Sequence, residues 1–137
     1  MKFSNSRLLA VAALAGCVAL LAAVPAFASS TKSAGTTVKV TISKANEFAF
    51  KLSPKSVKHG SVTFKITNGG VLPHDFKLCT SNKGGTANAC AGKVTPLISG
   101  GATGTLTVNI AKAGKYEYLC TVPGHAAQGM KGVLTVS

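Results

Sequence analysis

Apolar side chains recur at every second position in seven short segments of the chain, with polar side chains between them. This alternation puts the apolar side chains on one face of an extended segment, which is typical of half-buried β-strands. Turn-forming residues such as Asn68-Gly69-Gly70 and Ala113-Gly114 separate the segments. The seven predicted strands centre on residues 38–42, 48–52, 62–66, 74–78, 106–110, 116–120 and 132–136.

Short strands joined by turns predict an all-β fold, here an antiparallel Greek-key β-sandwich of about seven to eight strands. No segment beyond the N-terminal apolar run shows a convincing helical period. The segment 92–103 follows neither pattern and is the hardest to place. The strand count therefore depends on how that segment folds.

The N-terminal residues follow a different pattern. Two basic residues precede an apolar run at 8–24, and Ala26-Phe27-Ala28 then supplies a small-residue cleavage signal. This pattern predicts a signal peptide over residues 1–28. Two alternatives stay open. The run is about long enough to span a membrane if it is not cleaved, and Leu14-Ala15-Gly16-Cys17 resembles a bacterial lipobox that would carry a lipid on Cys17.

Residues 29–36 are rich in Ser, Thr and Gly and predict a flexible leader. Residues 37–137 then have the size of one domain, without an internal repeat. We expect a monomer exported to the periplasm, the cell surface or the medium. An uncleaved N-terminal segment or a lipidated Cys17 would instead hold it on a membrane.

Charge narrows the range of partners. Residues 29–137 hold 13 Lys and no Arg against three acidic residues, a net charge of +10 (13 − 3). A net positive charge suggests nucleic acid as a partner. However, the lysines are spread along the strands, and this stretch lacks Arg, the residue best suited to bind phosphate through two hydrogen bonds. We therefore expect no nucleic-acid partner. Diffuse positive charge favours an acidic protein or an anionic envelope surface.

The same stretch holds three cysteines, an odd number for an exported protein, which indicates one reactive or ligating thiol. Cys79 and Cys90 bracket a polar segment, 80–89, and predict a loop closed by a disulfide. Closing a loop of 12 residues (90 − 79 + 1) contributes about 3 kcal/mol to stability. This pairing leaves Cys120 free. The alternative, with Cys120 in the disulfide, agrees poorly with the residues around it.

Cys120 opens a segment with three kinds of metal ligand at Cys-x4-His-x4-Met spacing, the other two being His125 and Met130. Pro123-Gly124 turns the chain, so that His125 folds back towards the Cys120 sulfur. A second imidazole, His74, lies 46 residues upstream (120 − 74). Two His and one Cys in a plane with a long axial Met describe a blue-copper electron-transfer site. The spacing therefore predicts one mononuclear copper ion.

The run Cys-Thr-Val-Pro-Gly-His with a following Gly-Met, together with the upstream Asn68-Gly69-Gly70-x-x-Pro73-His74, closely resembles the cupredoxins. The azurin, auracyanin and rusticyanin branches come nearest, and the resemblance covers residues 36–137. It implies single-electron transport by Cu(I)/Cu(II) cycling with a transient redox partner. It also implies a copper ion bound by His74, Cys120, His125 and Met130.

One position departs from the family pattern, because relatives often carry Asn after the first His and this chain carries Asp75. The resemblance implies that Pro73, Asp75 and Thr121 surround the ligands and orient them, with Asp75 accepting hydrogen bonds from backbone N–H groups or from Thr121. The third imidazole, His59, stands in a turn without a soft ligand beside it. We expect it to be exposed and structural.

Three other functions are weighed against electron transport. A copper oxidase or nitrite reductase needs many more imidazoles than the three in this chain, so we expect no enzyme. An envelope copper carrier tends to have exposed Met- or His-rich sites, whereas Met130 is the only Met besides Met1. A metal-free sandwich interaction domain would make the four ligand types coincidental. The electron carrier is therefore the expected function.

Overall fold

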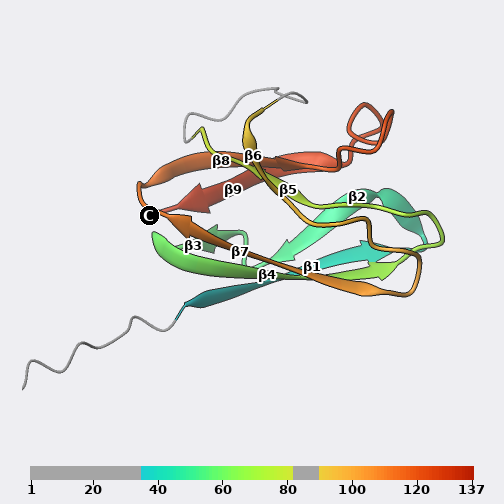
Figure 1. Cartoon of the computed structure of the whole chain (residues 1–137), viewed down its shortest axis with the longest axis horizontal. Coiled ribbons are helices and arrows are strands. Elements are labelled where there is room, and N and C mark those ends of the chain that lie inside the picture. Colours follow the sequence, from blue (N-terminus) through green and yellow to red (C-terminus); the bar gives the residue numbers. More distant parts are fainter. Residues whose placement is uncertain (1–34, 82–89) are drawn as a thin grey trace, which may run out of the picture. The chain divides into compact units, whose positions relative to one another are not determined.

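The structure, a computed structural model, describes residues 35–81 and 90–137, which form nine β-strands. The strands are β1 (Thr36–Ser43), β2 (Asn46–Ser53), β3 (Ser56–Val57), β4 (Gly60–Gly69), β5 (Lys77–Cys79), β6 (Gly92–Val94), β7 (Thr103–Ile110), β8 (Gly114–Leu119) and β9 (Lys131–Val136). One sheet has the order β2-β1-β4-β7 and the other β3-β9-β8-β5-β6. The two sheets face each other as layers (Figure 1). Among the described residues, no helix has the length and apolar character to cross a membrane.

Alternating side chains fill the space between the two sheets. Val38, Val40 and Ile42 of β1 are fully buried or nearly so, while the residues between them are exposed. Four aromatic rings pack across the interior, with centroid separations of 5.0 to 6.0 Å. These rings belong to Phe50, Phe64, Phe76 and Tyr118. Burying side chains of this size stabilises the fold by about 1.5–3 kcal/mol each.

The predicted all-β sandwich is confirmed, but its pairing is not wholly antiparallel. β1 runs parallel to β4 along its whole length, and β3 runs parallel to β9. Alternation has a period of two residues in either orientation, so the sequence pattern could not tell these pairings apart. The strand count also exceeds seven or eight, because the two-residue β3 and the three-residue β6 were not predicted. The strand predicted around residues 74–78 is shorter than expected: it is reduced to β5, and His74 lies outside it in an isolated bridge to Ile98.

Several predicted segments lie outside the described residues: the signal peptide 1–28 with Cys17, positions 29–34 of the leader, and positions 82–89 of the loop. Within the described part, β1 begins at Thr36, one residue before the predicted domain start. Cys79 and Cys90 form the predicted disulfide, with their Cα atoms 5.6 Å apart, and Cys120 is free.

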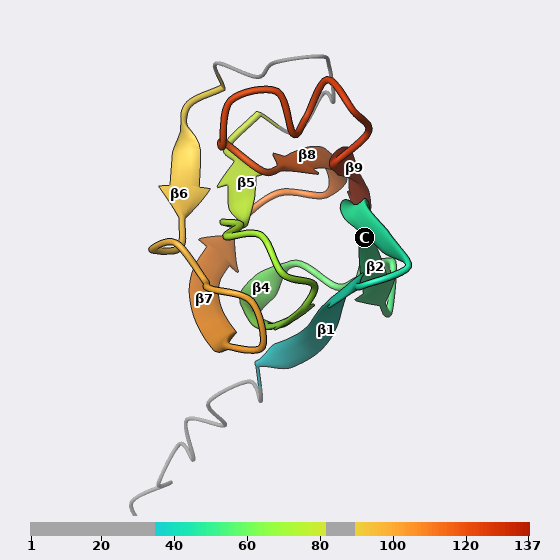
Figure 2. The ribbon, with the colours of Figure 1, turned by 90° about the vertical axis from the view of Figure 1, so that its right-hand side faces the viewer.

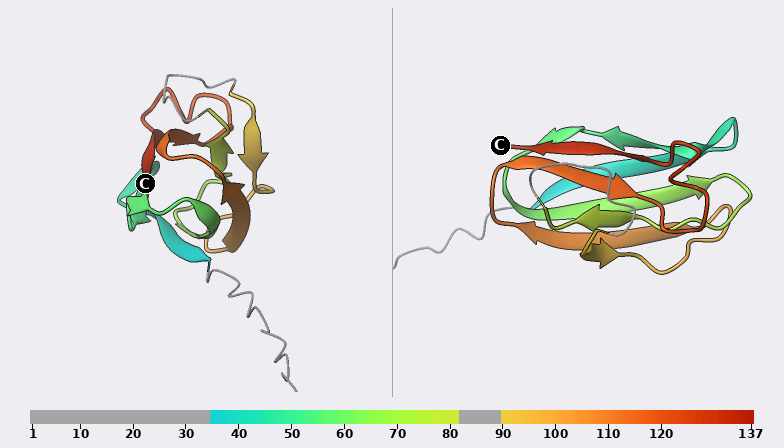
Figure 3. Two further views of the ribbon diagram at one scale, coloured as in Figure 1. Left: turned by 90° about the vertical axis from the view of Figure 1, so that its left-hand side faces the viewer. Right: turned by 90° about the horizontal axis from the view of Figure 1, so that it is seen from above.

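Three connections gather at the end of the sandwich away from Ser137, as Figure 2 shows end-on and the right panel of Figure 3 shows from above. They are the β4–β5 connection (70–76), the β6–β7 connection (95–102) and the β8–β9 connection (120–130). Each joins strands that the core already holds in place. This end of the fold therefore positions the predicted ligands.

Candidate metal centre

The β8–β9 connection folds back on itself through its own hydrogen bonds. The N–H of Cys120 donates to the carbonyl of Met130 (3.0 Å), and the N–H of Met130 donates to the carbonyl of His125 (3.1 Å). Gly124 (φ 83°) and Gly129 (φ 110°) adopt backbone conformations that favour glycine, at the two bends of the loop. The three predicted ligands of this loop are thus held together by local contacts.

His74 is held by partners that are distant in sequence. It exchanges both backbone hydrogen bonds with Ile98, at 3.1 and 2.7 Å. The fully buried Asn68 amide donates to the carbonyls of Leu72 (2.8 Å) and Ile98 (2.9 Å) and accepts the N–H of Gly70 (3.0 Å). This network fixes the β4–β5 connection, and with it the imidazole, against the β6–β7 connection.

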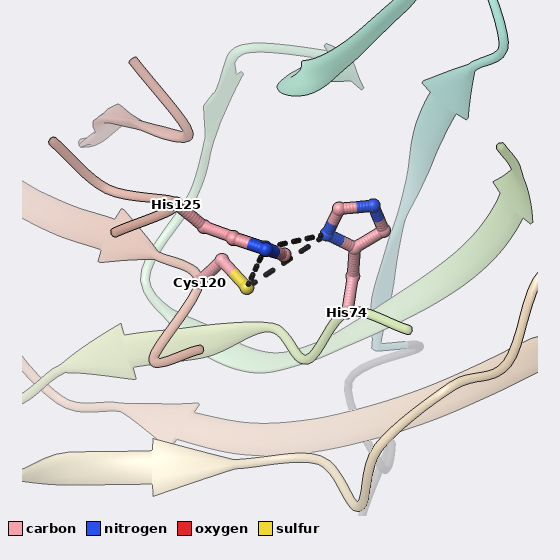
Figure 4. A group of neighbouring side chains, drawn as sticks. All are labelled: His74, Cys120 and His125. Atoms are coloured by element: carbon pink, nitrogen blue, oxygen red, sulfur yellow. Dashed lines mark hydrogen bonds between the residues drawn. The ribbon is translucent and has the colours of Figure 1, made fainter. Parts of the chain in front are cut away.

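The two segments bring His74, Cys120 and His125 together (Figure 4). The two Nδ1 atoms lie 3.1 Å apart, and the Cys120 Sγ lies 3.5 Å from Nδ1 of His125 and 4.0 Å from Nδ1 of His74. All three residues are buried, His125 the least at 8% exposed. Met130 is fully buried and belongs to the same apolar cluster as Cys120.

The chemistry of this donor set suits copper. A thiol and two imidazoles converge with their ligand atoms within 4.8 Å of one another, and no other cluster of three or more His, Cys, Asp or Glu was found among residues 35–81 and 90–137. Two imidazoles and one thiolate, with a thioether close by in the chain, are the donors of trigonal blue-copper centres. The residues present therefore fit a single copper ion.

Burial sets the protonation of the metal-free site. Burial raises the pKa of the Cys120 thiol to about 11, although the N–H groups of Asp75 and Val122 oppose this by hydrogen bonding to the sulfur. Burial also lowers the pKa of His74, and the neighbouring His125 lowers it further. The neutral imidazole is the form that binds a metal, and a metal ion displaces the thiol proton when it binds.

Asp75 makes the contacts that the resemblance implied. Its Oδ1 accepts the N–H of Thr121 at 2.6 Å, and its Oδ2 accepts the Thr121 hydroxyl. The carboxylate thus joins the His74 segment to the Cys120 loop. Pro73 lies exposed immediately before His74. The remaining imidazole, His59, is exposed as predicted, with Nδ1 3.1 Å from the Ser137 carbonyl.

Two neighbours of the site were missed at the sequence level. Glu47, near the start of β2, places Oε1 3.7 Å from Nε2 of His74. The ring of Phe48 packs edge-on against His125, with centroids 5.1 Å apart, and more loosely against His74 at 6.4 Å. Both residues lie more than 20 positions from the nearest ligand (74 − 48 = 26). No local motif marks them, since only the packing of β2 over the ligand loops brings them near.

Comparison with known proteins gives a family match and curated relatives. Residues 29–137 match the model of copper-binding proteins of the plastocyanin/azurin family. Auracyanin-B of Chloroflexus aurantiacus is 44% identical over 52 residues, 38% of this chain and 21% of that protein. The copper-resistant cuproprotein CopI of Rubrivivax gelatinosus is 31% identical over 113 residues, 73% of this chain and 66% of that protein. The chain thus spans about a fifth of the first relative and just under two thirds of the second.

Solved structures show the same fold. Auracyanin B superposes with a TM-score of 0.63 at 25% identity, covering 74% of this chain and 88% of that one. Auracyanin A from Chloroflexus aurantiacus gives 0.58 at 26% identity, covering 76% and 100%. A multicopper oxidase, mgLAC, gives 0.55 at 21% identity, covering 76% and 39%, which is a likeness of fold alone.

Proposed function

Because the chain belongs to the plastocyanin/azurin family of copper-binding proteins, we propose that it binds one copper ion and carries single electrons between redox partners. The observation behind this proposal is the convergence of His74, Cys120 and His125 within 4.8 Å in a buried site. We assign these three residues and Met130 as the ligands. When bound, copper supplies the one-electron chemistry that no side chain here provides.

The chain's own part is to hold the donors still. The Cys120–Met130 and Met130–His125 backbone hydrogen bonds close the loop, and the paired bonds between His74 and Ile98 fix the other imidazole. Donors held this firmly change position little between two oxidation states, which favours fast electron transfer. We propose that His125, the most exposed of the ligands, is where electrons enter and leave, and that the exposed Val71 and Leu72 belong to the apolar surface that a partner contacts.

We propose a partner with an acidic face. All three carboxylates of the chain are turned inward: Glu47 is 15% exposed, Asp75 6% and Glu117 7%. Ten of the eleven described lysines are exposed. The outward charge of the described residues is therefore almost wholly positive, which steers a monomer towards an acidic protein and also attracts it to an anionic envelope surface. Association with a partner should accordingly weaken as salt is added.

We also propose export from the cytoplasm. The Cys79–Cys90 disulfide supports an oxidising compartment, in agreement with the signal-like N-terminal pattern. Cell fractionation followed by intact mass measurement separates the forms: cleavage after Ala28, a lipid on Cys17, or an uncleaved chain. A full-length chain in the cytoplasm would contradict export.

Copper handling is the second candidate function, favoured by the match to a copper-resistant cuproprotein. A carrier should surrender copper quickly to a competing chelator. The enclosed ligands, from 0% to 8% exposed, favour slow release instead. Time-resolved chelator exchange distinguishes the two, and complete exchange within seconds would favour the carrier. Turnover of a phenol or of nitrite by the copper-loaded protein would instead show a copper enzyme; we expect none.

The decisive test of copper binding is a visible absorption spectrum of the purified protein after addition of Cu(II) and an oxidant. We expect an intense blue or green band that disappears on reduction, since it requires a bond from thiolate to Cu(II). The matched variant Cys120→Ser should fold and lack the band. A colourless wild-type protein without bound copper would overturn the electron-transfer proposal and favour a metal-free interaction domain.

A further inference from the structure

His74 carries a polar atom whose role the ligand set does not explain. Its Nε2 is buried and is the one buried side-chain nitrogen or oxygen, among the described residues, without a hydrogen-bond partner. An unpaired polar atom in the interior is costly. The carboxylate oxygen Oε1 of Glu47 lies 3.7 Å from it, just beyond hydrogen-bond distance.

Glu47 is itself held firmly in this position. Its Oε1 accepts the N–H of Leu72 at 2.5 Å and that of Val71. Gly70 closes the third side, because a Cβ at that position would lie only 2.2 Å from the same oxygen. Two backbone N–H groups thus hold this carboxylate oxygen in place as an acceptor. A fixed anionic oxygen therefore faces the outer nitrogen of His74.

The position of the imidazole proton follows from this arrangement. A neutral imidazole carries its proton on one nitrogen only. If His74 carried it on Nδ1, the lone pair of Nε2 would face the Glu47 carboxylate with no donor between them. If it carries the proton on Nε2, that N–H points towards an acceptor, and Nδ1 keeps the lone pair that a metal ligand needs.

We propose that Glu47 is a positioning residue that holds the proton of His74 on Nε2, so that Nδ1 is ready to bind copper before any metal arrives. This inference rests on the proposed function, because it takes His74 as a ligand. Carboxylates that accept the outer N–H of a ligating histidine fix its tautomer and ring orientation. Glu47 supplies that carboxylate from β2, which contributes no ligand itself.

A consequence follows for His125. Its Nδ1 lies 3.1 Å from Nδ1 of His74, so a proton must lie between two nitrogens that would otherwise oppose their lone pairs. With His74 protonated on Nε2, that proton belongs to His125. The metal-free site therefore contains one imidazole that is ready to ligate and one that must give up its Nδ1 proton to do so.

The test is long-range ¹H–¹⁵N correlation NMR of the imidazoles in the metal-free, full-length protein at neutral pH. The wild type should show His74 with its proton on Nε2 and His125 with its proton on Nδ1. Glu47→Ala should raise the fraction of His74 protonated on Nδ1. Glu47→Gln keeps an acceptor oxygen and should retain the wild-type pattern. Glu117→Gln, which removes a carboxylate from the other sheet, serves as the matched control.

A second readout is affinity for Zn(II), a redox-silent probe of the same donors. Removing a supporting group of this kind costs about 10–100-fold in metal affinity, so we expect Glu47→Ala to bind Zn(II) that much more weakly and Glu117→Gln to bind it unchanged. A wild-type His74 protonated on Nδ1 overturns the proposal. So does a Glu47→Ala variant with the wild-type tautomer and affinity.

The outcomes remain decisive if Glu47→Ala does not fold. In that case the wild-type tautomer still tests the proposal, and a shift to Nδ1 protonation in Glu47→Gln, which keeps the acceptor, would refute it. The NMR result needs no copper. A protein that fails to form a blue centre but shows the expected tautomers would contradict the proposed function, while the effect of Glu47 on the tautomer of His74 would still stand.

Discussion

The two segments that bring the ligands together are built in different ways. The loop 120–130 carries three of the proposed ligands and closes on itself through hydrogen bonds between its own residues. The segment 68–76 carries one ligand, His74, and is fixed by partners elsewhere in the chain, Ile98 and Glu47. One half of the site is thus specified locally and the other by the tertiary fold.

This difference determines how each half should respond to mutation. A change within the loop removes a ligand but leaves the supporting strands β8 and β9 paired. A change at a residue that supports His74, such as Asn68, removes contacts that hold the β4–β5 connection against the β6–β7 connection. We therefore expect ligand loss without unfolding on the loop side, and coupled loss of stability and metal affinity on the His74 side.

The largest effect is expected for Asn68→Ala, which removes the amide that bonds to Leu72, Ile98 and Gly70. Each lost hydrogen bond costs about 0.5–1.5 kcal/mol, and buried groups left unpaired cost more. We expect the free energy of unfolding of the metal-free protein to fall by about 3 kcal/mol, measured by urea denaturation. Metal affinity should fall with it, because His74 loses its support.

The matched control is Thr63→Val, on the same strand β4 as Asn68, which removes an exposed side-chain hydrogen bond to Thr107 of β7. A change of this kind should stay within about 0.5 kcal/mol. If Asn68→Ala costs no more than this control, the contrast between a locally closed loop and a braced His74 segment is wrong.

The same contrast explains what the sequence could reveal. The sequence alone indicates three of the ligands, Cys120, His125 and Met130, because their spacing and the turn between them lie within eleven residues (120 to 130). Asn68 read only as a turn residue, although it is fully buried and bonded to Ile98, 30 positions away. Glu47 stands next to an alternating strand and resembles any solvent-facing residue until β2 packs over the site.

The positions of the strands could be predicted from the sequence, whereas the pairing between them could not. Alternation along each strand is a local property, so the strands that carry this pattern and their buried faces could be predicted. The parallel pairing of β1 with β4 is a long-range property that leaves no trace in the period. Glu117 alternates with Tyr116 and Tyr118 along β8, yet all three are buried, Glu117 at 7% exposed. Alternation shows which face a side chain occupies, and other parts of the chain decide whether that face is covered.

The next largest effect is a pH dependence of the unfolding free energy of the metal-free protein. It has opposite signs for Cys120, in the loop, and for His74, in the other segment. Burial raises the pKa of Cys120 from 9.0 to about 11, so the folded protein keeps the proton over a range in which the unfolded chain has lost it. The unfolding free energy should hold its value below pH 9.0 and fall as the pH rises towards about 11, by at most about 2 kcal/mol.

For His74, the unfolding free energy should depend on pH in the acid range. Burial lowers the pKa of His74 below 6.5, so the unfolded chain binds a proton before the folded protein does. Stability should be complete above pH 6.5 and fall as the pH decreases below it. Glu47, with a pKa lowered below 4.5, adds to the loss at lower pH. Denaturant midpoints measured across the pH range would show both the alkaline and the acid loss of stability.

Cys120→Ser separates the alkaline loss of stability from the acid loss, because it removes only the thiol. The loss that begins near pH 9.0 should disappear in this variant, and only the part that comes from Tyr118, whose pKa burial raises above 10.0, should remain. The acid loss should persist. An alkaline loss of the same size in Cys120→Ser would assign it to other groups and break the contrast between the two halves.

The smallest effect is expected for Asp75→Asn, at the contact where the two halves meet. The side-chain oxygen of Asn still accepts the Thr121 N–H, but the negative charge beside the sulfur ligand is lost. Loss of that charge disfavours Cu(II) relative to Cu(I), so the reduction potential should rise. A difference of about 1 kcal/mol between the oxidation states corresponds to about 40 mV for one electron.

Thr121→Val is the control, since it removes the hydroxyl contact and keeps the charge. Redox titration showing an unchanged or lower potential in Asp75→Asn contradicts the charge argument. An equal rise in both variants would mean that Asp75 sets the potential by orienting the loop, as Glu47 orients His74 on the other side.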